Sequence, residues 1–304
     1  MRLIVFIIVI LGFAFSASAQ ETGPDITQVV EAQTAWQAKK NSKTRKALKA
    51  ALAAYDDDPT LETVRVHYDL LNHDIEHATP HKLRETAQAV VEHLEPVAEI
   101  LPQQYVEAKF IGAIALFNGR QKREAVLEMA EVEGRAYAAV DEEGERLGWA
   151  EDLHWKAYAW RLAMRAYFKS TGEWQPTEKQ VDEILAKWKA TSEQVNARAH
   201  VGETKDGALP HCAGELIQEP RMRYPAGKAM RGMFGSVILR FGFDEAGNIK
   251  EPEVMASIPL EGFKDRASET VSQWRFEATE PNEVGKTCRL HRENVVLPMV
   301  FAIG

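Results

Sequence analysis

The feature that most constrains the fold is a change in the spacing of apolar residues late in the chain. From residue 25 to about residue 200, apolar residues recur every three or four positions, which is the period of a helix. Between Val237 and Phe243 they alternate with other residues, as in a strand with one apolar face. The change predicts an all-helical region followed by a smaller region that contains a sheet, so the chain is expected to be α+β overall.

Caps and helix breakers divide the first region into short helices. Thr79 and Pro80 form an N-cap and a first-turn proline, Pro102 opens another helix, and Gly119 ends it. Short turns make such helices antiparallel neighbours, so residues 20–200 are expected to form a helical bundle or a helical-repeat domain. Residues 108–130 loosely resemble a tetratricopeptide unit. Residues 201–220 are rich in glycine and proline and are expected to be a linker.

The first residues predict export. A single arginine, an apolar run from Leu3 to Phe15 and the small residues Ser16 to Ala19 are typical of a signal peptide over residues 1–19. Cleavage after Ala19 would place the mature protein in the periplasm or outside the cell. The alternative is that residues 3–19 stay uncleaved as an inner-membrane anchor, with the rest of the chain facing the periplasm.

Charge and cysteine content narrow the function further. The net charge of -8 argues against a surface that binds nucleic acid. Cys212 and Cys288 are expected to form a disulfide in an oxidising compartment, worth about 4 kcal/mol by chain entropy, with two buried thiols as the alternative. Motifs for phosphate, dinucleotide or nucleophile chemistry are absent from the sequence, so no cofactor is expected.

The last 80 or so residues predict a small α+β domain. Strands are expected at residues 236–243 and 249–257, joined by a turn at Asp244 to Asn248 in which Gly247 takes a positive φ. A helix carrying Phe263, Ala267, Val271 and Trp274 is expected to cover the sheet, and a final strand runs from Asn294 to Ile303. The arrangement is a three-stranded antiparallel sheet with one or two helices.

These landmarks resemble the TonB C-terminal domain over residues 216–304, and we set the domain itself at residues 221–304. The residues that carry the resemblance are Tyr224, Pro225 and Ala229, the run from Gly235 to Asp244, Gly247, Asn248, Val254, Ser257, Phe263, Ala267, Trp274, Arg275, Phe276, Gly285 and Phe301.

The resemblance implies a non-enzymatic protein that binds partner peptides by β-strand addition and is linked to TonB-dependent transport across the outer membrane. The implied partner is an outer-membrane TonB-dependent transporter or another envelope protein. By resemblance, the partner strand would bind the last strand at Asn294, Val295, Val296, Leu297 and Val300. A homodimer by strand exchange is also compatible with an exposed edge.

Three features depart from the family pattern. The N-terminal apolar run contains no histidine, and no long proline-rich spacer follows it, which argues against a working energy transducer. Pro298 lies inside the proposed edge strand and cannot donate a backbone hydrogen bond. It either weakens an added peptide by one bond or protects the edge from unwanted pairing.

A remote alternative is a zinc hydrolase. His73, Glu76 and His77 fit the H-x-x-E-H pattern on a predicted helix, where two histidines one turn apart bind zinc beside a glutamate base. The region is rich in histidine and no downstream motif supplies a third ligand, so the pattern is expected to be a solvated helix face and no metal site is predicted there.

Overall fold

The computed structural model divides the chain into two compact units, residues 1–119 and residues 120–304. It describes residues 26–56, 58–141, 144–172, 178–199, 214–220, 224–229, 231–250, 252–259, 262–278, 290 and 292–302. The expected signal peptide and both cysteines, Cys212 and Cys288, lie outside these residues. Across the described ranges, no helix combines the length and apolar character needed to cross a membrane.

The first unit consists of helices. They are α1 (Thr27–Ala38), α2 (Ser42–Leu52), η1 (Ala53–Tyr55), α3 (Leu61–His77), α4 (Pro80–Leu94), η2 (Glu95–Val97) and α5 (Pro102–Asn118). The predicted boundaries at Thr79, Pro102 and Gly119 are confirmed: Thr79 accepts a hydrogen bond from the Lys82 amide, and Gly119 caps α5. The tetratricopeptide-like segment spans α5 and α6, which fall in different units, so the repeat interpretation stays a prediction.

A buried ionic network joins three helices of this unit. Arg45 of α2 donates to Asp74 of α3 at 2.8 Å from Nη1 and to Thr86 of α4 at 2.9 Å from Nη2. The Thr86 hydroxyl in turn donates to Asp74 at 2.6 Å. The Asp74 side chain is fully buried, so each of its oxygens needs such a partner.

The second unit begins with three helices, α6 (Lys122–Ala138), α7 (Gly148–Thr171) and α8 (Glu178–Ala199). Arg161 of α7 and Glu133 of α6 form a buried ion pair at 2.7 and 3.0 Å. Where α8 crosses α6, a Cβ on Gly134 would lie 2.4 Å from Trp188 Cδ1, so the close approach of the two helices requires glycine there.

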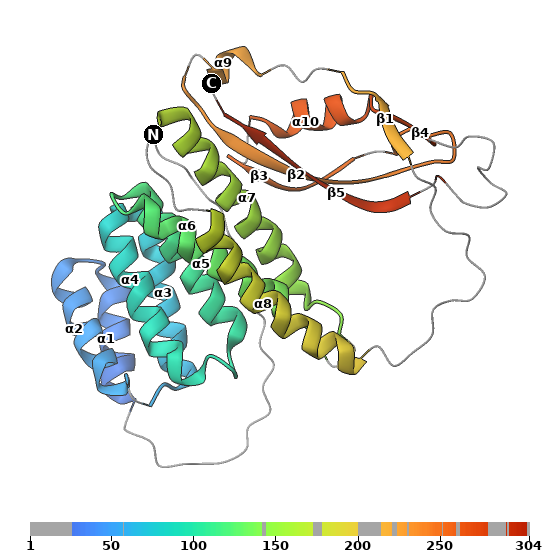
Figure 1. The fold of residues 1–304 in the computed structure, drawn as a ribbon. Coiled ribbons are helices and arrows are strands. Elements are labelled where there is room, and N and C mark those ends of the chain that lie inside the picture. Colours follow the sequence, from blue (N-terminus) through green and yellow to red (C-terminus); the bar gives the residue numbers. More distant parts are fainter. Residues whose placement is uncertain are drawn as a thin grey trace. The chain divides into compact units, whose positions relative to one another are not determined.

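The sheets follow the helices of this unit. The remaining elements are β1 (Gly214–Gln218), α9 (Ala226–Ala229), β2 (Gly235–Phe243), β3 (Glu253–Ile258), α10 (Lys264–Val271), β4 (Arg275–Ala278) and β5 (Arg292–Phe301). The order β3-β2-β5, with both pairs antiparallel, confirms the predicted three-stranded sheet (Figure 1). A second sheet of β1 and β4 was not predicted, and β1 lies within the expected linker.

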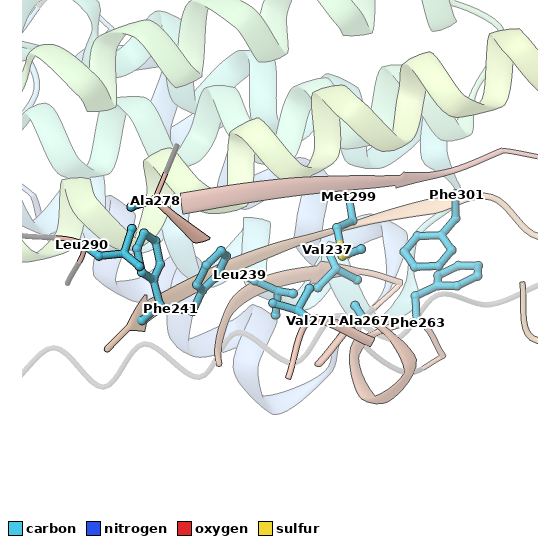
Figure 2. Packing of buried hydrophobic residues seen from close by; sticks show 11 residues of the cluster. Val237, Leu239, Phe241, Phe263, Ala267, Val271, Ala278, Leu290, Met299 and Phe301 are labelled. Atoms are coloured by element: carbon cyan, nitrogen blue, oxygen red, sulfur yellow. The ribbon is translucent and has the colours of Figure 1, made fainter. Parts of the chain in front are cut away.

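One face of the sheet packs on α10 as predicted. Figure 2 shows Val237 and Leu239 of β2 directed toward Val271, and the ring of Phe301 beside that of Phe263, with centroids 4.3 Å apart. Gly247 has φ +78°, as the turn after β2 requires.

The opposite face of the sheet packs on α7, which the sequence analysis missed. Ala159 and Leu162 of α7 form a cluster with Ile238 and Ala256, and Ser236 Oγ donates to the Ala159 carbonyl at 2.6 Å. The expected solvent face of β2 is therefore wrong, because Ser236 and Ile238 are both fully buried. The helices α6 to α8 thus belong to the same compact unit as the sheet.

Candidate functional site

The candidate site is the outer edge of β5. In the three-stranded sheet β5 pairs with β2 alone, so its other edge has no strand beside it among the residues that the structure describes. The strand begins two residues before the predicted start at Asn294, and its described part ends at Phe301. An edge of this kind presents unpaired amides and carbonyls to an incoming chain.

The alternation of hydrogen bonds along β2 shows which groups of β5 face outward. The Gly242 carbonyl accepts from Lys250 at 2.8 Å, on the side of β2 that faces β3. Even-numbered residues of β2 therefore direct their backbone hydrogen bonds toward β3, and odd-numbered residues direct theirs toward β5. Ile238 is even-numbered and lies opposite Pro298, so Pro298 is not in a hydrogen-bonded pair with β2.

The outward backbone groups of β5 follow from this register. Val296, Pro298 and Val300 direct their backbone groups to the open edge, whereas Leu297 and Met299 direct theirs to β2. Because Pro298 has no amide hydrogen, the open edge lacks one donor at this position, whereas the β2–β5 pairing loses no hydrogen bond. Val296 and Val300 each offer an amide and a carbonyl to a partner, and Pro298 offers a carbonyl alone.

The predicted site residues have three different environments. Val295 and Leu297 pack against the core beneath α10, and Val296 packs against the cluster formed by α7. Asn294 and Val300 are exposed. The structure therefore brings the five residues onto one strand, but leaves mainly the backbone and the Asn294 and Val300 side chains for contact with a partner.

Asn294 lies at an irregularity of the strand. Phe241 is opposite Val295 and Phe243 is opposite Arg292, so β5 has one extra residue between these pairs. Asn294 has φ +56°, a left-handed conformation that asparagine tolerates better than most residues. The regular part of the edge therefore begins at Val295.

A hollow of about 480 Å³ adjoins the start of this edge. It is bordered by β5 and β2 on one side and by the α6–α7 connection and the start of α7 on the other. The residues lining it are Tyr137, Val140, Gly144, Glu145, Arg146, Glu151, Trp155, Arg240, Asn294 and Val296.

Glu151 is the centre of the charges in this hollow. It accepts hydrogen bonds from Arg146, from the Trp155 indole and, at 3.0 Å, from Arg240. Burial alone raises the pKa of Glu151, but the Trp155 hydrogen bond and the neighbouring Arg146 guanidinium outweigh burial, so the pKa lies below its ordinary value. The carboxylate stays ionised and holds both arginines beside the edge strand.

Sequence reasoning did not find Glu151, Trp155 or Arg240 as site residues. Trp155 and Glu151 lie on α7, 80 or more positions before the three-stranded sheet begins at Gly235, and sequence spacing does not reveal that contact. One signal was present: Ile238 interrupts the expected polar face of β2, and near-continuous apolar runs are typical of strands buried on both faces.

The H-x-x-E-H residues lie on α3, and no third ligand joins them in the part of the chain that the structure describes. The His73 and His77 rings stack with centroids 4.7 Å apart, and His77 Nδ1 lies 3.0 Å from the His73 carbonyl. Within the described ranges, neither histidine nor Glu76 belongs to a group of three side chains able to share a metal. The geometry therefore gives the zinc-hydrolase alternative no support.

Comparison with known proteins identifies the C-terminal part of the chain. Residues 220–294 match the family described as Gram-negative bacterial TonB protein C-terminal, which confirms the resemblance stated above. The match covers α9, β2, β3, α10 and β4 and ends near the start of β5. No curated protein matches the chain.

Proposed function

We propose that the protein is a non-enzymatic, periplasmic TonB-family protein that binds an extended peptide by strand addition at β5. The peptide would belong to an outer-membrane TonB-dependent transporter or another envelope protein. The observation that carries the proposal is the open edge of β5, the strand that begins where the match to the TonB C-terminal family ends.

Main-chain hydrogen bonds would supply the affinity. A peptide beside β5 would meet the amide and carbonyl of Val296 and of Val300, and the carbonyl of Pro298 between them. Each net hydrogen bond is worth about 0.5 to 1.5 kcal/mol, so this short edge favours a weak and reversible contact. Such a contact suits a protein that must release its partner.

The hollow beside the edge would supply selectivity. Alternate side chains of an added strand point to opposite faces of the sheet, and those on the α7 face would lie near Trp155, Arg146 and Arg240. The Trp155 ring there favours a partner with an apolar residue at that position, since Glu151 already pairs with both arginines.

Peptides methylated on alternate backbone nitrogens would test strand addition directly. Fluorescence anisotropy of the full mature chain with a labelled TonB-box peptide should show binding. Two peptides are compared, one methylated on the odd-numbered backbone nitrogens and the other on the even-numbered ones. Because alternate amides of the peptide face β5, one of the two should lose binding and the other should bind nearly as well as the parent peptide. Equal binding of both methylated peptides, or no binding of the parent peptide, would refute the proposal.

The other candidate is a membrane-anchored energy transducer that retains residues 3–19. It shares the same binding edge and differs at the N-terminus alone. Mass spectrometry of the native chain separates the two: a first residue of Gln20 supports the periplasmic form, and an intact Met1 supports the anchored form.

A further inference from the structure

Two buried histidines and one aspartate, none of them part of the H-x-x-E-H pattern, converge in the first unit. Asp56 follows η1, His67 lies on α3 and His93 lies on α4. One ligand atom from each lies within 4.8 Å of the others. The His67 and His93 rings are 4.3 Å apart, and His93 Nδ1 is 3.6 Å from an Asp56 oxygen.

The surroundings of His93 leave its Nδ1 atom facing the site. The other ring nitrogen, Nε2, lies 2.8 Å from the Thr63 hydroxyl. That hydroxyl also lies 2.9 Å from the Thr60 carbonyl, to which it can donate, and it then accepts from His93 Nε2. In this arrangement His93 Nδ1 directs a lone pair toward the Asp56 carboxylate.

The second histidine adds another unsatisfied atom at the same place. His67 is 7% exposed and His93 is 1% exposed, and among the described residues neither His67 Nε2 nor His93 Nδ1 has a hydrogen-bond partner. Buried polar atoms are rarely left without a partner, so these two ring nitrogens are available to a ligand.

We propose that Asp56, His67 and His93 bind a divalent transition-metal ion such as Zn²⁺. Imidazole nitrogen and carboxylate oxygen are ligands that zinc prefers, and two histidines with one carboxylate leave a fourth position for water. Ligand atoms on a tetrahedral zinc are about 3.3 Å apart, so the side chains need to close by roughly 1.5 Å at most. Asp56 can provide this movement and an entry path, because its side chain is 61% exposed.

The bound ion would tie α3, α4 and the segment after α2 together. The hydrogen bond from His93 to Thr63 would fix the ring orientation, as outer hydrogen bonds do for most metal-binding histidines. The sequence separations of these ligands fit no zinc motif, which is why sequence reasoning did not find them.

Calorimetric titration with ZnCl₂ tests the site in the full mature chain, purified without a histidine tag and freed of metal by a chelator. The wild-type chain should saturate at one Zn²⁺. Asp56→Asn should weaken binding by about 10-fold or more, because outer-shell changes alone cost 10- to 100-fold at such sites. This residue is exposed, so the variant should fold normally.

His77→Asn is the matched control, since it removes an exposed histidine of the neighbouring H-x-x-E-H pattern. It should change zinc affinity by less than about 2-fold. In ¹⁵N spectra, zinc should shift His67 Nε2 and His93 Nδ1. Absence of binding, unchanged affinity in Asp56→Asn, or loss of binding in His77→Asn would each overturn the proposal.

Discussion

Asp74 is the most deeply buried charge in the first unit, and its neighbours make it a sensitive residue. Asp74→Asn removes the anion that balances Arg45, which is 7% exposed and would keep an unpaired buried charge. We expect the free energy of unfolding to fall by about 3–5 kcal/mol. Urea denaturation followed by circular dichroism measures the change.

Glu76→Gln on the same helix is the control for Asp74→Asn. The Glu76 side chain is 69% exposed, so its neutralisation should change the unfolding free energy by no more than about 0.5 kcal/mol. A similar decrease in the free energy of unfolding in both variants would show that the buried Arg45–Asp74 pair contributes no more to stability than an exposed charge does.

His154 gives the second unit a pH dependence. Burial, followed by the Arg146 charge, lowers the pKa of this histidine to about 4, against about 6.5 in an unfolded chain. Between these values the unfolded chain binds a proton that the folded chain does not. The contribution of His154 to the free energy of unfolding should therefore be fully present above pH 6.5. The free energy of unfolding should fall by up to about 1.4 kcal/mol per pH unit as the pH drops toward 4.

The variant His154→Gln isolates this contribution. Urea unfolding at pH 7 and pH 5, followed by tryptophan fluorescence, should show a smaller acid-induced loss in the variant than in the wild-type chain. Identical pH dependence of the two proteins would contradict the assignment to His154.

At the scale of elements, the two residues at the end of β5 should respond in opposite ways to proline. Val300→Pro removes an amide that faces the open edge, whereas Met299→Pro removes one that pairs with β2. We expect Val300→Pro to weaken peptide binding by about 0.5–1.5 kcal/mol and to leave stability nearly unchanged. Met299→Pro should lower the melting temperature clearly.

Thermal denaturation and peptide anisotropy of both variants measure these effects. Comparable destabilisation by the two prolines would show that the assigned direction of the backbone groups is wrong. Unchanged peptide binding in Val300→Pro would show that the Val300 amide does not bind the peptide.

The elements themselves follow largely from local signals, and their assembly does not. Thr79, Pro102 and Gly119 mark helix boundaries because capping and backbone geometry act within a few residues. The two-residue period of β2 and the turn at Gly247 are equally local. The packing of α7 on Ile238 depends on residues more than 75 positions apart, and no local pattern encodes it.

The site shows the same division. The position of β5 at an edge was predicted from the family resemblance, and Pro298 in that strand agrees with it. Glu151 and Arg240 were missed because their 3.0 Å contact exists in the folded chain alone. Asp56, His67 and His93 were missed for the same reason, since three different elements supply them.

At the scale of the whole molecule, the sheet should depend on helices outside the family match. Ala159 and Leu162 of α7 cover Ile238 and Ala256. A fragment of residues 201–304 would expose this apolar face, whereas residues 120–304 keep it covered. We expect the shorter fragment to bind the dye ANS strongly and to melt at a lower temperature.

Parallel purification of the two fragments provides the comparison, with ANS fluorescence and thermal denaturation as measurements. Equal melting temperatures and weak dye binding by both would show that the sheet is stable without α7.

Pro298 divides the open edge into two short docking points. Val296 and Val300 are four residues apart, a span of about 13 Å along a strand. A ligand shorter than about five residues would hold one docking point, and a longer one would hold both, with the second contact made intramolecular by the first. Peptide affinity should therefore increase abruptly once the peptide is long enough to contact both docking points. A bound chain under tension could dissociate from one docking point while it stays bound at the other.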